Sequence, residues 1–235
     1  MAISAGTVSV EDLRACVILQ GLPPADLDRV RAAVRARGYV RGETVIEHQD
    51  TGGDVFLLFS GQLLANRYSA AGREISYRRI LAGSYFGELA AFDGQPRSVN
   101  VVALSEARVG CIPARTFRDL IDTSPSFAGA LLADMASRVR ELSNRLFEAS
   151  AVTVPGRVDA ELIRLAIAAG VDGNRAVIAQ APTHAEFAAL IGGQRETVTR
   201  ALGRLADLGI VVKRGRDLVI ADVEALIERV EEVGG

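Results

Sequence analysis

The sequence is poor in the residues that build disulfides, metal sites and redox centres. Its 235 residues include only two cysteines, Cys16 and Cys111, which lie far apart and form no CxxC motif. This argues against a disulfide framework, a zinc site or an iron–sulfur cluster, so we expect no metal cofactor. Each cysteine is better explained as a filler of apolar space.

Signals for export and membrane insertion are also missing. The N-terminus has no basic region followed by an apolar run, and no apolar stretch reaches membrane-spanning length. These absences, with so little cysteine, favour a reducing cytoplasm and predict no membrane partner. The net charge of −2 gives no overall attraction to nucleic acid, so any such binding needs a local patch.

Catalytic patterns are absent as well. The chain has no Ser/His/Asp grouping, no metal-ligand spacing and no nucleotide-hydrolysis loop, which predicts that it is not an enzyme. Its composition, 49% hydrophobic and 24% charged, is that of an ordinary globular chain with one large or two small domains.

One stretch, Ser84 to Ser98, has the features of an anion-binding turn. Gly87 lets backbone N–H groups approach a ligand, and the start of a short helix favours negative charge. Arg97 offers a planar fork that matches a phosphate, and Ser98 adds a hydroxyl. Glu88 would repel phosphate, but it fits if it accepts hydrogen bonds from a sugar hydroxyl. The combination suggests a nucleotide, and the alternative is a surface turn with an Arg–Glu pair.

Residues 86–90 and 96–98 closely resemble the phosphate-binding cassette of cyclic-nucleotide-binding domains, including the spacing between the glycine–glutamate pair and the arginine. The resemblance implies that the glycine and serine contact the cyclic phosphate, the arginine pairs with it, and the glutamate takes the ribose 2′-hydroxyl. The implied allosteric ligand is cAMP or cGMP. The candidate contacts of this segment are Gly87, Glu88, Leu89, Arg97 and Ser98.

The chain around this segment predicts an antiparallel barrel or double-sheet jelly roll after two helices, residues 9–19 and 26–37. Short β-rich runs at even spacing, separated by glycine turns, carry the prediction. The expected strands are Thr44–Glu47, Asp54–Phe59, Gln62–Tyr68, Glu74–Ile80, Val99–Leu104 and Ala107–Ile112.

A long helix is expected from Ser126 to about Ala149. Its apolar residues alternate at spacings of four and three, which is typical of a coiled-coil seam and predicts a homodimer. The alternative is a helix packed on its own domain through Phe127, Leu131 and Phe147, and both can hold. The seam consists of Ala128, Leu132, Met135, Val139, Leu142, Leu146 and Ala149.

The C-terminal third predicts a winged helix-turn-helix. A hinge over residues 152–156 and a helix precede a helix capped by Thr183, a glycine turn, a second helix over residues 194–208 and a β-hairpin. The first turn of the second helix carries Gln194, Arg195, Glu196 and Thr197, with Arg200 one turn later.

Residue types on this helix suit base reading. Arginine can grip guanine in two places, and glutamate can accept a hydrogen bond from cytosine. The alternative is that Glu196 and Arg200 simply pair across one helical turn. Thr183 and His184, with Arg214 and Arg216 at the wing tip, are candidate phosphate contacts.

Together these segments resemble the cAMP-receptor branch of the CRP/FNR transcription regulators. The resemblance implies that Arg195, Glu196 and Arg200 read a TGTGA-type half-site, that double-stranded DNA is bound as a palindrome, and that RNA polymerase is a partner. Gln194 replaces the serine usual in that branch, so flanking-base contacts can differ.

Two departures affect the choice of ligand. The branch carries an adjacent threonine and serine that touch adenine, and the matching positions are Leu142 and Ser143. Leucine cannot accept from the adenine amino group, and Ser98, by analogy with cGMP-selective domains, favours guanine. The resemblance as a whole still leans modestly to cAMP.

The sequence therefore predicts an α+β chain with three parts: a jelly-roll cyclic-nucleotide-binding domain (1–125), a dimerisation helix and hinge (126–151) and a winged helix-turn-helix DNA-binding domain (152–235). We expect ligand binding to reposition two recognition helices on DNA. The alternatives are a cyclic-nucleotide module that acts through protein partners, or a CRP/FNR-type regulator with a different ligand or none.

Overall fold

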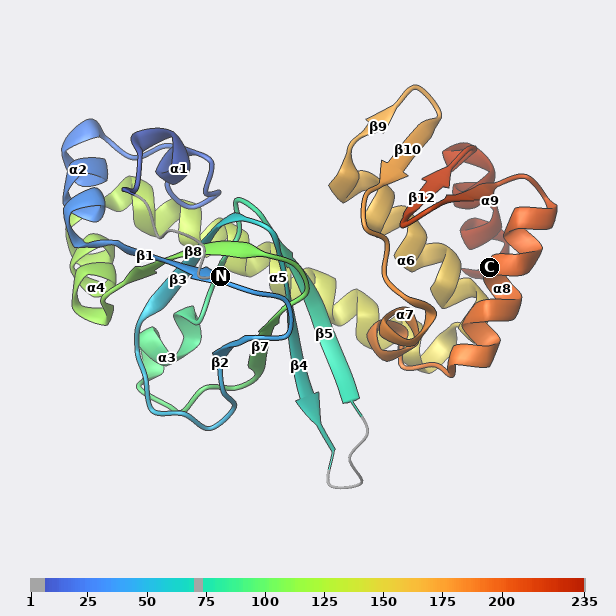
Figure 1. Ribbon diagram of the computed structural model, residues 1–235, viewed down its shortest axis with the longest axis horizontal. Helices are drawn as coiled ribbons and strands as arrows, with labels where there is room; N and C mark the ends of the chain where they lie inside the picture. Colours follow the sequence, from blue (N-terminus) through green and yellow to red (C-terminus); the bar gives the residue numbers. More distant parts are fainter. Residues whose placement is uncertain (1–6, 70–73, 235) are drawn as a thin grey trace. The chain divides into compact units, whose positions relative to one another are not determined.

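The computed structural model describes residues 7–69 and 74–234, and the chain divides into two compact units, Met1–Val139 and Arg140–Gly235. Figure 1 shows that the first unit combines helices with β-sheets and that the second consists of helices and a small sheet. The boundary falls inside one continuous helix, α5 (Pro125–Ala151). In the described ranges no helix has both the length and the apolar character needed to cross a membrane.

The first two helices are shorter than the sequence predicts. α1 (Val10–Arg14) starts with a capping box of Ser9 and Asp12, but the prediction of helix to residue 19 is wrong. The Val17 N–H donates instead to the carbonyl of Gly83 at 2.9 Å, which bends the chain into a series of turns.

α2 (Pro24–Ala33) also ends early, because Val34 adopts an extended conformation with ψ 137°. The residues after it form β1 (Arg35–Tyr39), which pairs with β8 (Ala107–Ile112) along its whole length. The prediction of helix up to Arg37 is therefore wrong, since sheet pairing outweighs helical spacing at this position.

The jelly roll consists, in the described residues, of two four-stranded antiparallel sheets with the orders β1-β8-β3-β6 and β2-β7-β4-β5. Side chains from both sheets, among them Leu58, Leu63, Ile80 and Val109, fill the core between them. All six expected strands form, and the short strands β1 and β6 were not expected. The remaining strands are β2 (Thr44–Ile46), β3 (Val55–Ser60), β4 (Gln62–Tyr68), β5 (Glu74–Leu81), β6 (Tyr85–Phe86) and β7 (Asn100–Ala103).

Helices α3 (Glu88–Asp93), α4 (Ala114–Thr123) and α5 complete this unit. The rings of Phe117 and Phe127 meet edge to face, with centroids 5.5 Å apart, and anchor α5 on the N-terminal core. This confirms the prediction that Phe127 packs on its own domain.

The seam of α5 is largely open to solvent. Four of its large residues, Leu132, Val139, Leu142 and Leu146, are each more than half exposed, whereas Met135 packs against the N-terminal core. Phe147, expected to pack on its own domain, is 65% exposed, so that expectation is wrong. An exposed apolar stripe of this kind is what a helix left without its partner presents.

The second unit is built around α6 (Val154–Ala169), which shares a core with α7, α8 and the small sheet. The expected hinge over residues 152–156 is mostly helix, because Thr153 caps α6 by accepting a hydrogen bond from the Gly156 N–H. The sheet order is β11-β12-β10-β9. The other elements are β9 (Val171–Asp172), β10 (Arg175–Ile178), α7 (His184–Ile191), α8 (Arg195–Asp207), β11 (Val211–Arg214), β12 (Asp217–Ile220) and α9 (Val223–Gly234).

Candidate functional site

The anion-binding turn takes its shape from two glycines in the left-handed region. Gly87, with φ 81°, caps the start of α3, and Gly94, with φ 67°, caps its end. A Cβ on Gly87 would lie 2.8 Å from Nη1 of Arg97, so only glycine lets the turn and the guanidinium come this close.

Arg97 is buried against this turn, with 5% of its surface exposed. Its Nη1 donates to the Gly87 carbonyl at 2.8 Å and its Nη2 to the Asp54 carbonyl at 2.9 Å, while its guanidinium carbon lies 5.5 Å from the centroid of the Phe56 ring. Burial lowers the pKa of Arg97, and the nearby carboxylates Asp54 and Asp50 oppose the shift. The fork is thus held in place by backbone, and a guanidinium with five donors can bind an anion as well.

The other cassette residues divide between interior and surface. Glu88 is 7% exposed, whereas Leu89 is 46% exposed and Ser98 lies on the surface. The structure therefore brings Gly87 and Arg97 into contact, with Glu88 buried beside them at the start of α3.

Glu88 is paired with a residue that no local sequence motif connects to the cassette. Its Oε1 accepts from Nη1 of Arg138, on α5, at 2.9 Å. In the alternative stated from the sequence, a surface turn with an Arg–Glu pair, Glu88 would pair with Arg97. In the structure its partner is Arg138. Arg138 also pairs with Asp134, and it stacks 4.0 Å from the centroid of the Tyr85 ring.

A second unexpected arginine lies at the same place. Arg78 and Arg138 both donate to the Tyr85 carbonyl, at 3.1 and 3.3 Å, and the Tyr85 hydroxyl donates to Asp134 at 2.7 Å. Burial and then the charge of Arg138 lower the pKa of Arg78. The Asp134–Arg138 pair, four residues apart, was visible as a helical pattern, but its position beside Glu88 depends on tertiary folding.

Leu142 and Ser143 lie in the second unit, on the exposed surface of α5. Their expected contact with a ligand is a hypothesis about a bound, dimeric state.

The start of α7 is built as predicted. The Thr183 hydroxyl accepts from the Glu186 N–H, and the Thr183 N–H donates to the Glu186 carboxylate at 2.7 Å. Gly192, with φ 64°, then turns the chain toward α8.

α8 presents its candidate base readers to solvent. Gln194 is the N-cap, Arg195 and Glu196 are exposed in the first turn, and Arg200 follows on the exposed side. Val198, fully buried, lies on the opposite side of the helix in the core.

The expected alternative, an ion pair between Glu196 and Arg200, does not form among the described residues. Arg200 donates instead to the Thr197 hydroxyl at 3.3 Å. Glu196 is therefore not held by the arginine one turn away, and a carboxylate in this position can accept from a base.

His184 links α7 to α8. Its Nδ1 lies 2.8 Å from the Thr199 hydroxyl, which itself donates to the Arg195 carbonyl. Burial, followed by the charges of Lys213 and Arg195, lowers the pKa of His184, so the neutral ring is favoured. This contact gives His184 a structural role beside any contact with phosphate.

Two further observations concern metal ligands and thiols. No group of three or more His, Cys, Asp or Glu residues that could hold a metal ion occurs in the part of the chain that the structure describes. Burial raises the pKa of the Cys16 thiol to about 12 and that of Cys111 to about 11, so neither forms a reactive thiolate near neutral pH.

Comparison with known proteins identifies both parts of the chain. Residues 36–124 match the family model of the cyclic nucleotide-binding domain, and residues 156–229 match that of the Crp-like helix-turn-helix domain. The chain is 30% identical over 213 residues to the CRP-like cAMP-activated global transcriptional regulator of Mycobacterium tuberculosis, which covers 90% of this chain and 95% of that protein. It is also 30% identical over 213 residues to the cyclic AMP receptor protein of Thermus thermophilus, covering 91% and 95% of the two chains.

Among solved structures, FixK2 from Bradyrhizobium japonicum superposes with a TM-score of 0.75 at 20% identity, covering 83% of this chain and 96% of that one. This likeness concerns the fold. The catabolite activator protein of Thermus thermophilus superposes with a TM-score of 0.52 at 28% identity, over 92% and 99% of the two chains.

Proposed function

The chain belongs to the CRP/FNR family of transcription regulators, and we propose that it is a homodimer whose binding to a palindromic operator is controlled by a cyclic nucleotide. Cyclic-nucleotide binding and DNA binding follow from its two family domains, and its relatives are named as regulators rather than enzymes. The observation that carries the proposal is the buried Arg97 fork, held against Gly87 beside the buried Glu88.

In this proposal Gly87, Arg97 and Ser98 hold the cyclic phosphate, Glu88 accepts from the ribose hydroxyl, and Leu89 borders the ligand. cAMP is the favoured ligand, because the relatives from Mycobacterium tuberculosis and Escherichia coli are named as cAMP-activated. cGMP should be measured beside it, because Leu142 and Ser143 stand at the positions of the threonine and serine that touch adenine in the cAMP-receptor branch and do not by themselves select a base.

The DNA-binding proposal rests on α8. Arg195, Glu196 and Arg200 are exposed at and after its first turn and carry the donors and acceptors that read base edges in the major groove. We assign them a TGTGA-type half-site, with Gln194 and Thr197 beside them and Thr183 and His184 near the phosphates. The exposed seam of α5 supports the homodimer, and two-fold symmetry then requires two half-sites.

The control mechanism that we propose uses α5. Asp134 and Arg138 connect this helix to Tyr85 and Glu88, so a sugar hydroxyl at Glu88 must share that carboxylate with Arg138. Ligand binding then changes the contacts that Arg138 makes with Glu88, and so the contacts of α5 with the first unit. α5 continues into the second unit. The nucleotide activates only if it binds the DNA-competent state more tightly.

The test combines calorimetry with gel shifts. Wild-type protein should bind cAMP or cGMP with measurable heat and should shift a TGTGA palindrome only when nucleotide is present. A dimer that binds nucleotide but shifts no palindrome would favour the alternative, a module that acts through protein partners. DNA binding without any nucleotide response would favour a regulator with another ligand or none.

Within this proposal the chain has a nucleotide domain at 1–125, a dimerisation helix at 126–151, and a DNA-binding domain at 152–235. It acts in the cytoplasm, where operator DNA and RNA polymerase are available to it.

A further inference from the structure

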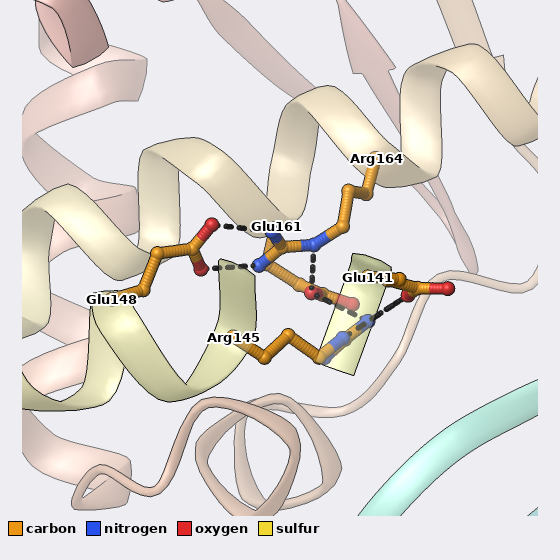
Figure 2. Close-up of polar contacts among 5 residues, drawn as sticks. All are labelled: Glu141, Arg145, Glu148, Glu161 and Arg164. Carbon is orange, nitrogen blue, oxygen red and sulfur yellow. Dashed lines mark hydrogen bonds and ion pairs between the residues drawn. The ribbon is translucent and has the colours of Figure 1, made fainter. Parts of the chain in front are cut away.

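Five charged side chains of the second unit form one connected ionic cluster, which we call the α5–α6 clamp (Figure 2). Glu141, Arg145 and Glu148 come from the last turns of α5, and Glu161 and Arg164 come from α6. Figure 2 shows the two arginines reaching between the helices, each toward carboxylates of both.

The geometry of the clamp is that of strong ion pairs. Arg164 binds Glu148 in a bidentate manner, with Nη1 and Nη2 at 2.7 and 2.9 Å from the two carboxylate oxygens, and its Nε donates to Glu161 at 2.8 Å. Arg145 lies 3.1 Å from Glu141 and 3.3 Å from the same Oε2 of Glu161. Planar forks of this type fix orientation as well as distance.

The cluster is largely shielded from solvent, so its ion pairs are screened less than exposed pairs are. The side chain of Glu161 is 4% exposed, and those of Arg164 and Glu148 are 24% and 19% exposed. Burial lowers the pKa of Arg164, but its hydrogen bonds with Glu148 and Glu161 outweigh the burial, so the net shift is upward. Removal of Arg164 would leave the partly buried Glu148 without its arginine and the buried Glu161 with Arg145 alone, a larger loss than at an exposed pair.

The clamp is connected to α8, the proposed recognition helix, because α6 packs against α8 through apolar side chains. Val158 and Leu162 of α6 lie in one core cluster with Val198 and Leu205 of α8. α5 ends at Ala151 and α6 begins at Val154, so two residues of backbone join them. The ion pairs of Glu148 and Arg145 with α6, together with a 3.3 Å hydrogen bond from Arg157 of α6 to the Ala149 carbonyl of α5, link α6 to the end of α5. Because α8 shares a core with α6, these links also constrain α8.

We propose that the α5–α6 clamp sets the half-site spacing that the protein accepts, with Arg164 as a positioning residue for DNA reading. The inference rests on the proposed function, a dimer joined along α5 that binds two half-sites. In such a dimer the angle between α5 and α8 fixes the separation of the two recognition helices, which must match about one DNA turn, roughly 34 Å. A loosened clamp lets α8 adapt to several separations.

The experiment measures binding to a series of palindromes with the same TGTGA half-sites, in which the spacer is shortened or lengthened by one and two base pairs. Wild-type protein with cAMP or cGMP should bind one spacing at least about tenfold more tightly than its neighbours, comparable to the cost of a wrong base pair. Arg164→Leu should reduce this preference to about threefold or less while nucleotide affinity stays unchanged.

Arg229→Leu is the matched control. Arg229 forms a 3.0 Å ion pair with Asp159, also on α6, from α9 rather than α5. Its loss removes a cation from a buried carboxylate of the same helix, so it should lower stability and keep the sharp spacing preference. Arg164→Lys, which keeps the charge without the fork, should lie between wild type and Arg164→Leu.

Glu148→Gln keeps the Arg164–Glu161 pair within α6 and serves if Arg164→Leu does not fold. It should also flatten the spacing preference. A folded clamp variant that keeps the wild-type preference would overturn the inference and leave the proposed function intact. Wild-type protein that binds no palindrome of the series would overturn both.

Discussion

At the scale of single residues, the anion-binding turn depends on how closely Gly87 and Arg97 approach. Replacing Gly87 with alanine adds a Cβ at 2.8 Å from the guanidinium and places a side chain at φ 81°. We expect Gly87→Ala to lower the free energy of unfolding by about 1–2 kcal/mol, the usual cost of left-handed backbone, and to reduce nucleotide affinity at least about tenfold. Urea denaturation and calorimetric titration measure the two effects.

Gly94→Ala is the control that distinguishes backbone strain at positive φ from displacement of Arg97. Gly94 has φ 67°, but a Cβ there meets no atom within 4 Å. This variant should show the loss of stability with nucleotide affinity unchanged. Equal loss of affinity in both variants would show that the space beside Arg97 is not what matters.

Glu196 tests base reading at the same scale. Because no arginine partner holds it one helical turn away, Glu196→Ala should leave the fold intact. We expect this variant to lose about 1–3 kcal/mol of discrimination at one base pair of the half-site. Competition between the TGTGA palindrome and singly substituted operators measures this. A uniform loss across all operators would instead point to a general electrostatic contribution.

At the scale of elements, α5 carries a row of exposed large apolar side chains. Leu142 and Leu146 lie on the exposed seam, whereas Phe147 lies off it although it is 65% exposed. We predict that Leu146→Glu yields a folded monomer, because a charge in the seam must be desolvated in the dimer. Phe147→Glu should remain dimeric. Sedimentation equilibrium distinguishes them, and a dimeric Leu146→Glu would place the interface elsewhere.

Elements also show where local reasoning from sequence succeeds. The cap at Thr183 and all six expected strands were predictable, because glycine turns, caps and alternating apolar residues are local signals. The end of α2 and the chain after α1 were not predictable in this way. In both places long-range contacts, β1 with β8 and Val17 with Gly83, decide the backbone.

The site shows the same division. Gly87, Glu88 and Arg97 stand close together in the sequence and could be recognised from it. Arg138 lies 50 residues from Glu88, and Arg78 comes from a strand, so neither carried a local signal that would join it to the cassette. The clamp was missed for the same reason, because Glu148 and Arg164 meet only when α5 and α6 fold together.

At the scale of the whole molecule, the proposed control by nucleotide requires that the anion-binding turn in the first unit affects α8, the candidate recognition helix, in the second. α5 carries contacts at both ends: Asp134 and Arg138 beside Glu88, and Glu141, Arg145 and Glu148 in the clamp. Control by ligand is then a difference in affinity between two states of one dimer, and the coupling must act in both directions.

The most direct measurement of this claim is operator affinity, with and without saturating cAMP or cGMP, for wild-type protein and for Arg97→Lys, which keeps the charge and removes the fork. We predict that nucleotide strengthens operator binding of the wild type at least about fivefold, the lower end of usual allosteric coupling, and does not change operator binding of the dimeric, folded variant. Wild-type protein that binds its operator equally tightly in both conditions, or a variant that responds as wild type does, would contradict it.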